Sequence, residues 1–149
     1  MVENLTAEAF KKFGEYVQRP VAESSDGGAF HEYWHELHAE YFGDEALTTG
    51  CLSIIAYDRK ESVIERHLSC AEIFVTVKGQ GVIAVADPSE LERAANSKDA
   101  FHYFRLKEGD AVLLKQGVWH MLPVPDGGCV DFLMIVPKRI LSDIDKKTL

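Results

Sequence analysis

The sequence is short of positive charge. Its 16 lysine and arginine residues stand against 24 aspartate and glutamate residues, which gives a formal net charge of −8. Binding to a nucleic-acid backbone needs a basic surface, so this balance argues against DNA or RNA as a partner. No apolar run approaches the ~20 residues of a transmembrane helix, and the N-terminus lacks the basic and apolar regions of a signal peptide. We expect a globular chain with neither nucleic-acid nor membrane partners.

Cysteine is sparse as well. The three cysteines, Cys51, Cys70 and Cys129, are odd in number and form no CxxC pair. This pattern is typical of reduced thiols in a cytosolic protein and unlike a disulfide framework. We therefore expect the chain to be cytoplasmic.

Internal repeats and low-complexity linkers are also absent, and 149 residues suit one compact domain. We predict a single domain over 1–149, in which a helical and loop segment at 1–50 packs on a barrel core at 51–137. An insertion at 88–95 is expected to form a helical turn. The charged tail after Lys138 is expected to be peripheral.

From residue 52 onward, apolar and polar residues alternate with the period of two that is typical of β-strands. Turns rich in glycine and aspartate separate these runs. Short strands at this spacing indicate a β-sandwich or barrel, so we predict an all-β fold. The predicted strands are 52–57, 63–67, 73–77, 82–86, 101–106, 111–114 and 130–136.

The N-terminal segment follows a different period. Residues 6–17 predict a short amphipathic helix, because Phe10, Phe13 and Val17 share one helical face. Thr6 stands where a side-chain oxygen can cap the first turn. A short N-terminal helix packed on β-strands is the expected arrangement.

One set of polar residues carries the chemistry. Glu65 and His67 are two apart, so on a strand both side chains leave the same face. Glu72 follows after a short connection, and His120 ends a later hairpin-like segment. Two imidazoles and a carboxylate are common ligands of a divalent metal such as Zn, Mn, Ni or Fe, which predicts a metal site at His67, Glu72 and His120. The alternative is a metal-free pocket in which Glu–His hydrogen bonds satisfy these groups, and Glu65 is a fourth ligand, a general base or a partner of His67.

These positions resemble the two signature motifs of the cupin family. Those motifs are usually written G-x5-H-x-H-x3,4-E-x6-G and G-x5-P-x-G-x2-H-x3-N. The chain reads Glu65-x-His67-x4-Glu72-x6-Gly79 and Gly109-x5-Lys115-x-Gly117-x2-His120. The resemblance implies a jelly-roll β-barrel, with Glu65 in place of the usual first histidine and Lys115 in place of the usual proline.

A second string, His31-Glu32-x-x-His35, spells the HExxH sequence of zinc proteases. On a helix His31, His35 and His38 would share one face. The chain is small for a protease, and no later motif supplies a third ligand. We therefore favour a histidine- and aromatic-rich segment that closes the barrel mouth or forms a dimer contact.

Lys115 has two interpretations. It is a catalytic-site cation for a carboxylate-bearing substrate, or it is a solvated turn residue. Trp119 is expected to pack rather than to stack on substrate, and Arg66 alternates with its neighbours and so points to the opposite face of its strand. Cys70 lies between two predicted ligands, but nothing in the sequence indicates an activated thiol.

Several short sequence motifs are similar to those of the ureidoglycolate lyase family. They are the opening NLTAEAFKKFGEYV, ERH at 65–67, VWH at 118–120 and VDFLMI at 130–135. The resemblance implies a carbon–nitrogen lyase that cleaves ureidoglycolate to glyoxylate and urea in purine nitrogen salvage, commonly as a homodimer. It also implies that Glu65, His67 and His120 line the site. Where the family usually has glutamine, this chain has Glu72, which restores a cupin-type metal ligand.

This family chemistry needs one base and one acid. The base would be Glu65, Glu72 or a histidine, and His120 is our choice of acid. A metal at His67, Glu72 and His120 would hold the small carboxylate substrate and lower the pKa of its hydroxyl. The alternatives are a metal-dependent cupin isomerase or oxygenase acting on another small acid or sugar, and a non-catalytic ligand-binding cupin.

Overall fold

The structure, a computed structural model, describes residues 1–18, 26–27, 32–33, 45–55, 62–93 and 95–149. His31, His35 and His38 lie outside the described residues, so the interpretation of the HExxH string stays a prediction. No helix in the described ranges is long and apolar enough to cross a membrane.

Two long strands organise the fold. β7 (Glu72–Ala86) and β10 (Trp119–Pro137) pair in antiparallel register along most of their length, and each bends from one layer of strands into a second layer. Gly79 lies in the bend of β7 with a φ of +72°, and a Cβ there would overlap the carbonyl oxygen of Cys129. Glycine therefore permits the close approach of the two paired backbones at this bend.

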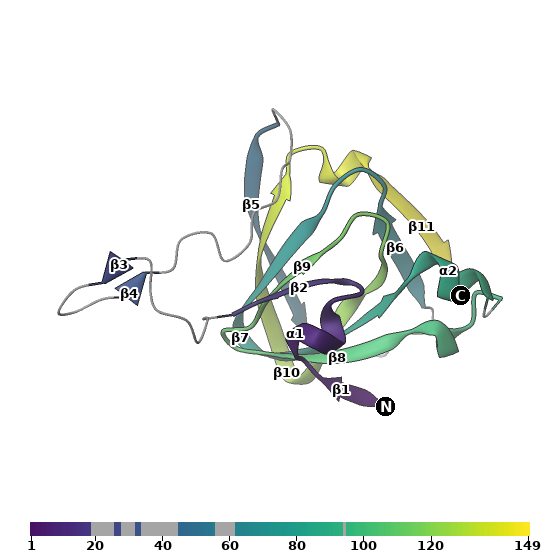
Figure 1. Cartoon of the computed structure of the whole chain (residues 1–149), viewed down its shortest axis with the longest axis horizontal. Helices are drawn as coiled ribbons and strands as arrows, with labels where there is room; N and C mark the ends of the chain where they lie inside the picture. The colour runs from purple at the N-terminus through teal and green to yellow at the C-terminus, as the bar shows by residue number, and fades with distance from the viewer. Residues whose placement is uncertain (19–25, 28–31, 34–44, 56–61, 94) are drawn as a thin grey trace.

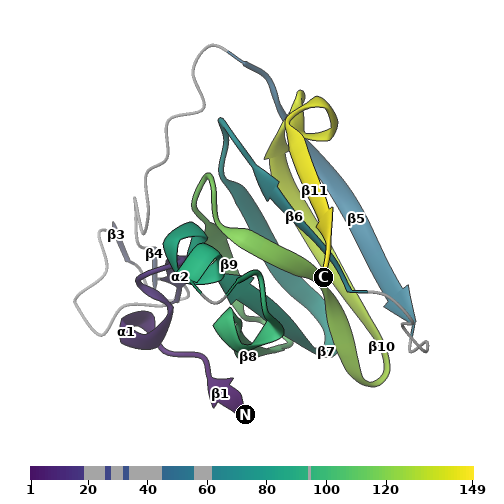
Figure 2. The ribbon, with the colours of Figure 1, turned by 90° about the vertical axis from the view of Figure 1, so that its right-hand side faces the viewer.

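Each layer is completed by shorter strands beside this pair of long strands (Figures 1 and 2). One layer takes the first half of β7 and the second half of β10, flanked by β9 (Ala111–Leu114), β2 (Gly14–Val17) and β5 (Leu47–Ile55). The other takes the remaining halves, flanked by β8 (His102–Lys107), β1 (Val2–Asn4), β6 (Val63–His67) and β11 (Ile144–Thr148). The predicted all-β jelly-roll fold is confirmed.

The remaining elements are short. They are α1 (Ala7–Phe10), β3 (Asp26–Gly27), β4 (Glu32–Tyr33), α2 (Pro88–Arg93), η1 (Lys98–Ala100) and η2 (Ile140–Ser142). The helical turn predicted at 88–95 corresponds to α2. Strands 63–67 and 111–114 are confirmed at their predicted bounds, whereas 73–77 and 82–86 are two halves of the single strand β7.

Strand alternation divides the apolar residues between two clusters. The larger fills the space between the layers and contains five phenylalanines that meet mostly at tilted or edge-to-face angles: Phe10, Phe13, Phe74, Phe104 and Phe132. The smaller lies on the outer side of the second layer, where Leu91 of α2 covers Ile64, Ala84 and Trp119. Polar residues on the inner side of the second layer therefore border the main core.

The helix predicted over 6–17 is wrong in its extent. Thr6 does cap α1, since its Oγ1 accepts a hydrogen bond from the Ala9 N–H at 3.1 Å, but α1 ends at Phe10. The chain then enters β2, which pairs with β9. Phe10 and Phe13 are both buried as expected. Pairing in the sheet has overridden the helical period of this segment.

Gly14 makes this pairing possible, because a Cβ at this position would overlap the carbonyl oxygen of Leu113. We expect Gly14→Ala to lower the free energy of unfolding by about 1–3 kcal/mol, the usual cost of overpacking. Gly128→Ala is the matched control, since a Cβ there meets nothing within 4 Å. Urea unfolding of both variants tests the difference, and equal midpoints would contradict it.

The C-terminal tail, which was expected to be peripheral, forms an edge strand of the sheet. β11 pairs in antiparallel register with β6, with Ile144 opposite His67 and Lys146 opposite Glu65. Both views show β11 beside β6 (Figures 1 and 2). The tail therefore borders the strand that carries two of the predicted site residues.

Candidate active site

Three strands bring the predicted site residues together. Glu65 and His67 project from β6, Glu72 begins β7, and His120 lies on β10 directly opposite Glu65. A hydrogen bond of 2.7 Å from the Gly117 N–H to the His67 carbonyl ties the turn before His120 to β6. His67, Glu72 and His120 are only 6%, 5% and 1% exposed. They form a buried polar cluster between the two layers, with Glu72 from the first layer and the two histidines from the second.

The imidazole of His120 lies between two carboxylates. Its Nε2 is 2.9 Å from Oε1 of Glu72 and 3.6 Å from Oε1 of Glu65. Its Nδ1 is 3.2 Å from the carbonyl oxygen of Val118, which accepts the N–H. His67 completes the group, with its Nε2 3.6 Å from Oε2 of Glu72.

This arrangement favours a protonated His120. Burial alone would lower its pKa, but the charge of Glu72 and the contact with Glu65 outweigh burial, so the His120 pKa is raised. Burial likewise opposes ionisation of Glu72, but His120 and then His67 lower its pKa. The contact with the His120 imidazole lowers the pKa of Glu65 against a smaller opposing effect of burial. At neutral pH an imidazolium is therefore held between two carboxylates.

The same residues fit a divalent metal. His67, Glu72 and His120 each offer one ligand atom, and the three atoms lie within 4.8 Å of one another. Within the described part of the chain, Oε1 of Glu72 and Nε2 of His120 are buried without a hydrogen-bond partner. The 2.9 Å approach of His120 to Glu72 is thus a contact of charges whose angles do not suit a hydrogen bond. Unsatisfied nitrogen and oxygen atoms of this kind are what a bound cation would satisfy.

Sequence reasoning missed Lys146. Its ammonium lies 3.1 Å from Oε2 of Glu65, while its side chain is 56% exposed. It therefore stands at the edge of the cluster, where Glu65 is the more exposed of the two carboxylates. The pentapeptide of β11 carries few apolar residues, so its alternation gave too little signal to predict a strand.

Lys115 contacts a different part of the molecule. It is exposed, and its ammonium donates a hydrogen bond of 2.9 Å to the carbonyl oxygen of Lys11 at the end of α1. This contact favours the interpretation of Lys115 as a turn residue, whose hydrogen bond links the end of α1 to the β9–β10 connection. A catalytic role for Lys115 stays a prediction, without a contact to the cluster to support it.

Arg66, Trp119 and Cys70 occupy the places expected of them. Arg66 points away from the cluster, pairs with Asp145 at 2.8 Å and lies 4.5 Å above the ring of Trp119, which packs in the smaller apolar cluster. Burial, and then the hydrogen bond to Asp143, raise the pKa of the Cys70 thiol to about 12. Cys70 is therefore a protonated thiol at neutral pH and no activated nucleophile.

A jelly-roll of this kind with histidine and glutamate on its inner side defines a cupin-type protein. The family model for ureidoglycolate lyase matches residues 1–149. The chain therefore belongs to the ureidoglycolate lyase family, which confirms the family predicted from the sequence.

Among solved structures, the chain is similar to vicilin from Solanum lycopersicum (tomato), at 23% identity and a TM-score of 0.44 over 68% of this chain and 26% of that one. It is similar to vicilin from Solanum melongena, at 14% identity and a TM-score of 0.46 over 85% and 32%. Peruvianin-I, a cysteine peptidase from Thevetia peruviana latex, matches at 13% identity and a TM-score of 0.46 over 60% and 49%. The chain spans less than half the length of each of these proteins. A search of curated proteins found no match.

Proposed function

We propose that this protein cleaves ureidoglycolate to glyoxylate and urea. The observation that carries the proposal is the buried imidazole of His120, held between Glu72 and Glu65 in a chain of the ureidoglycolate lyase family. Elimination across a carbon–nitrogen bond needs a proton donor and a base close together. His120 and the carboxylates beside it offer both.

The substrate chemistry assigns roles to these groups. In ureidoglycolate one carbon carries both a hydroxyl and a urea nitrogen. As the C–N bond breaks, the hydroxyl loses its proton and becomes the carbonyl of glyoxylate, while the departing nitrogen gains a proton. His120 gives its Nε2 proton to that nitrogen, and Glu65 takes the hydroxyl proton. Glu65 suits the second role because its side chain is 17% exposed, against 6% for Glu72.

The two transfers support each other. The contact with His120 lowers the Glu65 pKa, so Glu65 becomes a stronger base as His120 loses its proton. Glu72 remains ionised beside His120 and stabilises the imidazolium before the reaction. In a separate, metal-bound mode, His67, Glu72 and His120 would hold a divalent ion, which would supply Lewis-acid chemistry that lowers the hydroxyl pKa, and His120 would then be a ligand without a proton to donate. Elemental analysis of protein purified without added metal, repeated on His67→Ala, separates this mode from the metal-free one.

The test of the function is product analysis on racemic ureidoglycolate. We expect glyoxylate and urea in equal amounts, at a rate well above that of a blank containing heat-denatured protein. Ammonia in place of urea would contradict a lyase, because hydrolysis at the urea carbon would then be the reaction. The absence of turnover, with and without divalent metal, would contradict the proposed function as a whole.

Lys146 is the group that we propose for binding the substrate carboxylate, in the role that the sequence had suggested for Lys115. Lys146→Met should raise KM by about 10–100-fold with a smaller effect on kcat, since a hydrogen bond between charged groups contributes about 1.5–3 kcal/mol. Lys147→Met is the matched control, because the Lys147 ammonium contacts Asn96. Equal KM values for the two variants would contradict this role.

We further propose a single domain that assembles as a homodimer in the cytoplasm. The pairing of β1, β2 and β11 with core strands supports one domain.

Exposed apolar side chains on the outer side of the first layer support a contact between two copies, among them Val77, Leu133 and Ile55. The free thiols of Cys51, Cys70 and Cys129 support a reducing compartment. Light scattering that gives the mass of a monomer would contradict the dimer.

A further inference from the structure

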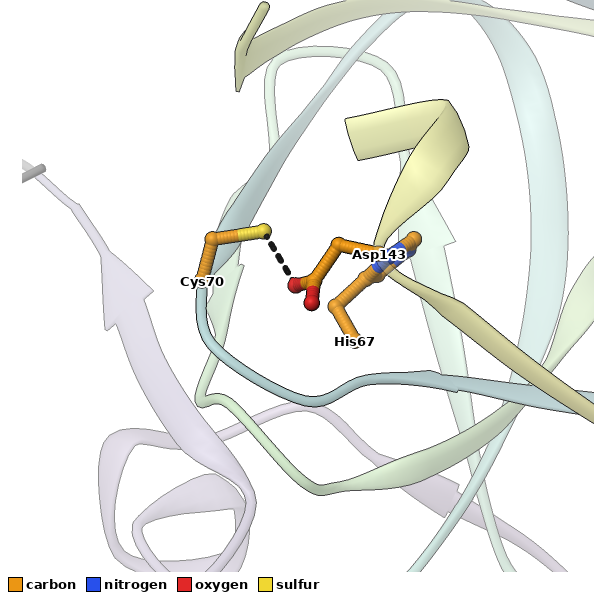
Figure 3. Close-up of side chains that lie close together, drawn as sticks. All are labelled: His67, Cys70 and Asp143. Carbon is orange, nitrogen blue, oxygen red and sulfur yellow. Dashed lines mark hydrogen bonds between the residues drawn. The ribbon is translucent and has the colours of Figure 1, made fainter. Parts of the chain in front are cut away.

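A second group of ligand-type side chains adjoins the cluster. His67 ends β6, Cys70 lies in the β6–β7 connection, and Asp143 follows η2 just before β11. Each offers one ligand atom, and the three atoms lie within 4.8 Å of one another. Figure 3 shows the Cys70 thiol directed at the Asp143 carboxylate, 3.1 Å from Sγ to Oδ2, with the His67 side chain beside them.

The neighbourhood holds these atoms in place. Asp143 accepts hydrogen bonds from the backbone N–H of Ser69 at 2.9 Å and from its hydroxyl at 3.0 Å. The Leu68 N–H donates to the Asp143 carbonyl at 3.4 Å, so the β6–β7 connection is tied to the turn before β11. Cys70 is 4% exposed and His67 is 6% exposed.

The cluster around His120 leaves one nitrogen of His67 without a partner. Nδ1 of His67 is buried and has no hydrogen-bond partner within the described part of the chain. The contact that His67 makes with Glu72 uses Nε2. A buried imidazole nitrogen without a partner costs free energy, unless a cation or a proton donor satisfies it.

We propose that His67, Cys70 and Asp143 form a binding site for a thiophilic divalent cation of the Zn²⁺ and Cd²⁺ class. A thiolate, a carboxylate and an imidazole are ligands that such cations accept, and the two anionic ligands balance the charge of the ion. On binding, the Cys70 thiol releases its proton to solvent and the metal–sulfur bond replaces the S–H bond, so no oxidant or reductant is needed. The sulfur ligand distinguishes this site from the group of His67, Glu72 and His120.

The site has a consequence for activity that rests on the proposed function. Because His67 belongs to both groups, a cation bound to His67, Cys70 and Asp143 competes with Glu72 for the His67 side chain. Such a cation acts as an inhibitor of urea release. Cys70 itself takes no part in the proposed reaction.

Binding is tested without reference to activity, by adding Cd²⁺ to the metal-free full-length chain and recording the ultraviolet thiolate-to-metal charge-transfer band. We expect one equivalent of cation to develop the band in the natural protein and in Cys51→Ser, and no band in Cys70→Ser. His120→Gln, which removes a ligand from the other group, should keep the band, and Asp143→Asn should weaken it. Absence of the band in the natural protein, or its persistence in Cys70→Ser, would overturn the site.

Inhibition is measured separately, as the Cd²⁺ concentration that halves urea release. Cys70→Ser should retain the basal rate and raise this concentration by at least about 100-fold, because loss of a direct ligand costs more than the roughly 10–100-fold that loss of an outer partner of a ligand costs. Equal inhibition of Cys70→Ser and the natural protein would overturn the inhibitory role. If the proposed lyase function itself failed, the charge-transfer measurement would still decide whether the site exists.

Discussion

His120→Gln should lower kcat for urea release by about 10³-fold while leaving KM within a few-fold. The expected loss lies in the middle of the 10²–10⁴ range for removal of a general acid or base. Glutamine keeps a polar side chain of similar length near Glu72 and Glu65, so the cluster should persist while the transferable proton is lost. A stopped assay for urea gives both constants.

The pH profile distinguishes this role from a structural one. Because Glu72 and Glu65 raise the pKa of His120, the acid form persists above the usual range of a histidine and is lost only at alkaline pH. The natural protein should therefore lose kcat as pH rises through this raised pKa, and His120→Gln should lack that alkaline limb. His102→Gln is the matched control, since His102 is half-exposed and pairs with Glu3 at 3.1 Å. A kcat for His120→Gln within threefold of the control would contradict the assignment.

Part of the cluster could be predicted from local strand geometry. Glu65 and His67 are two residues apart on one strand, and their common face follows from strand geometry alone. The addition of Glu72 and His120 needed the family spacing, because their proximity depends on pairing between β6, β7 and β10. The structure brings all four residues together at the predicted place.

The edges of the site could not be predicted in this way. Lys146 and Asp143 reach the cluster because β11 pairs with β6, a strand far earlier in the chain. The charged sequence of β11 carries too little apolar alternation to predict a strand. Gly14 poses the same difficulty, since the close approach to Leu113 that favours β2 over a longer helix is a tertiary contact.

Glu72→Ala should lower the free energy of unfolding of the metal-free protein by about 3–5 kcal/mol, the usual cost of removing one partner of a buried ion pair. His120 is 1% exposed and loses its nearest anion, so it must either keep an uncompensated charge or give up its proton. Urea unfolding in the presence of a chelator measures the change. Glu92→Ala, on the exposed side of α2, is the control and should stay within about 0.5 kcal/mol of the natural protein.

The pH dependence of this difference follows from the two pKa directions. Glu72 has a lowered pKa, so its contribution is present above its ordinary value of 4.5 and is lost as pH falls through the lowered pKa. His120 has a raised pKa, so its contribution is complete below its ordinary value of 6.5 and is lost as pH rises through the raised pKa. The stability difference between the natural protein and Glu72→Ala should therefore be largest between these two ordinary values and shrink on both sides. A stability difference that does not change with pH would mean that Glu72 contributes packing rather than charge. The Glu72 carboxylate would then not stabilise the protonated form of His120, which the proposed reaction needs as its acid.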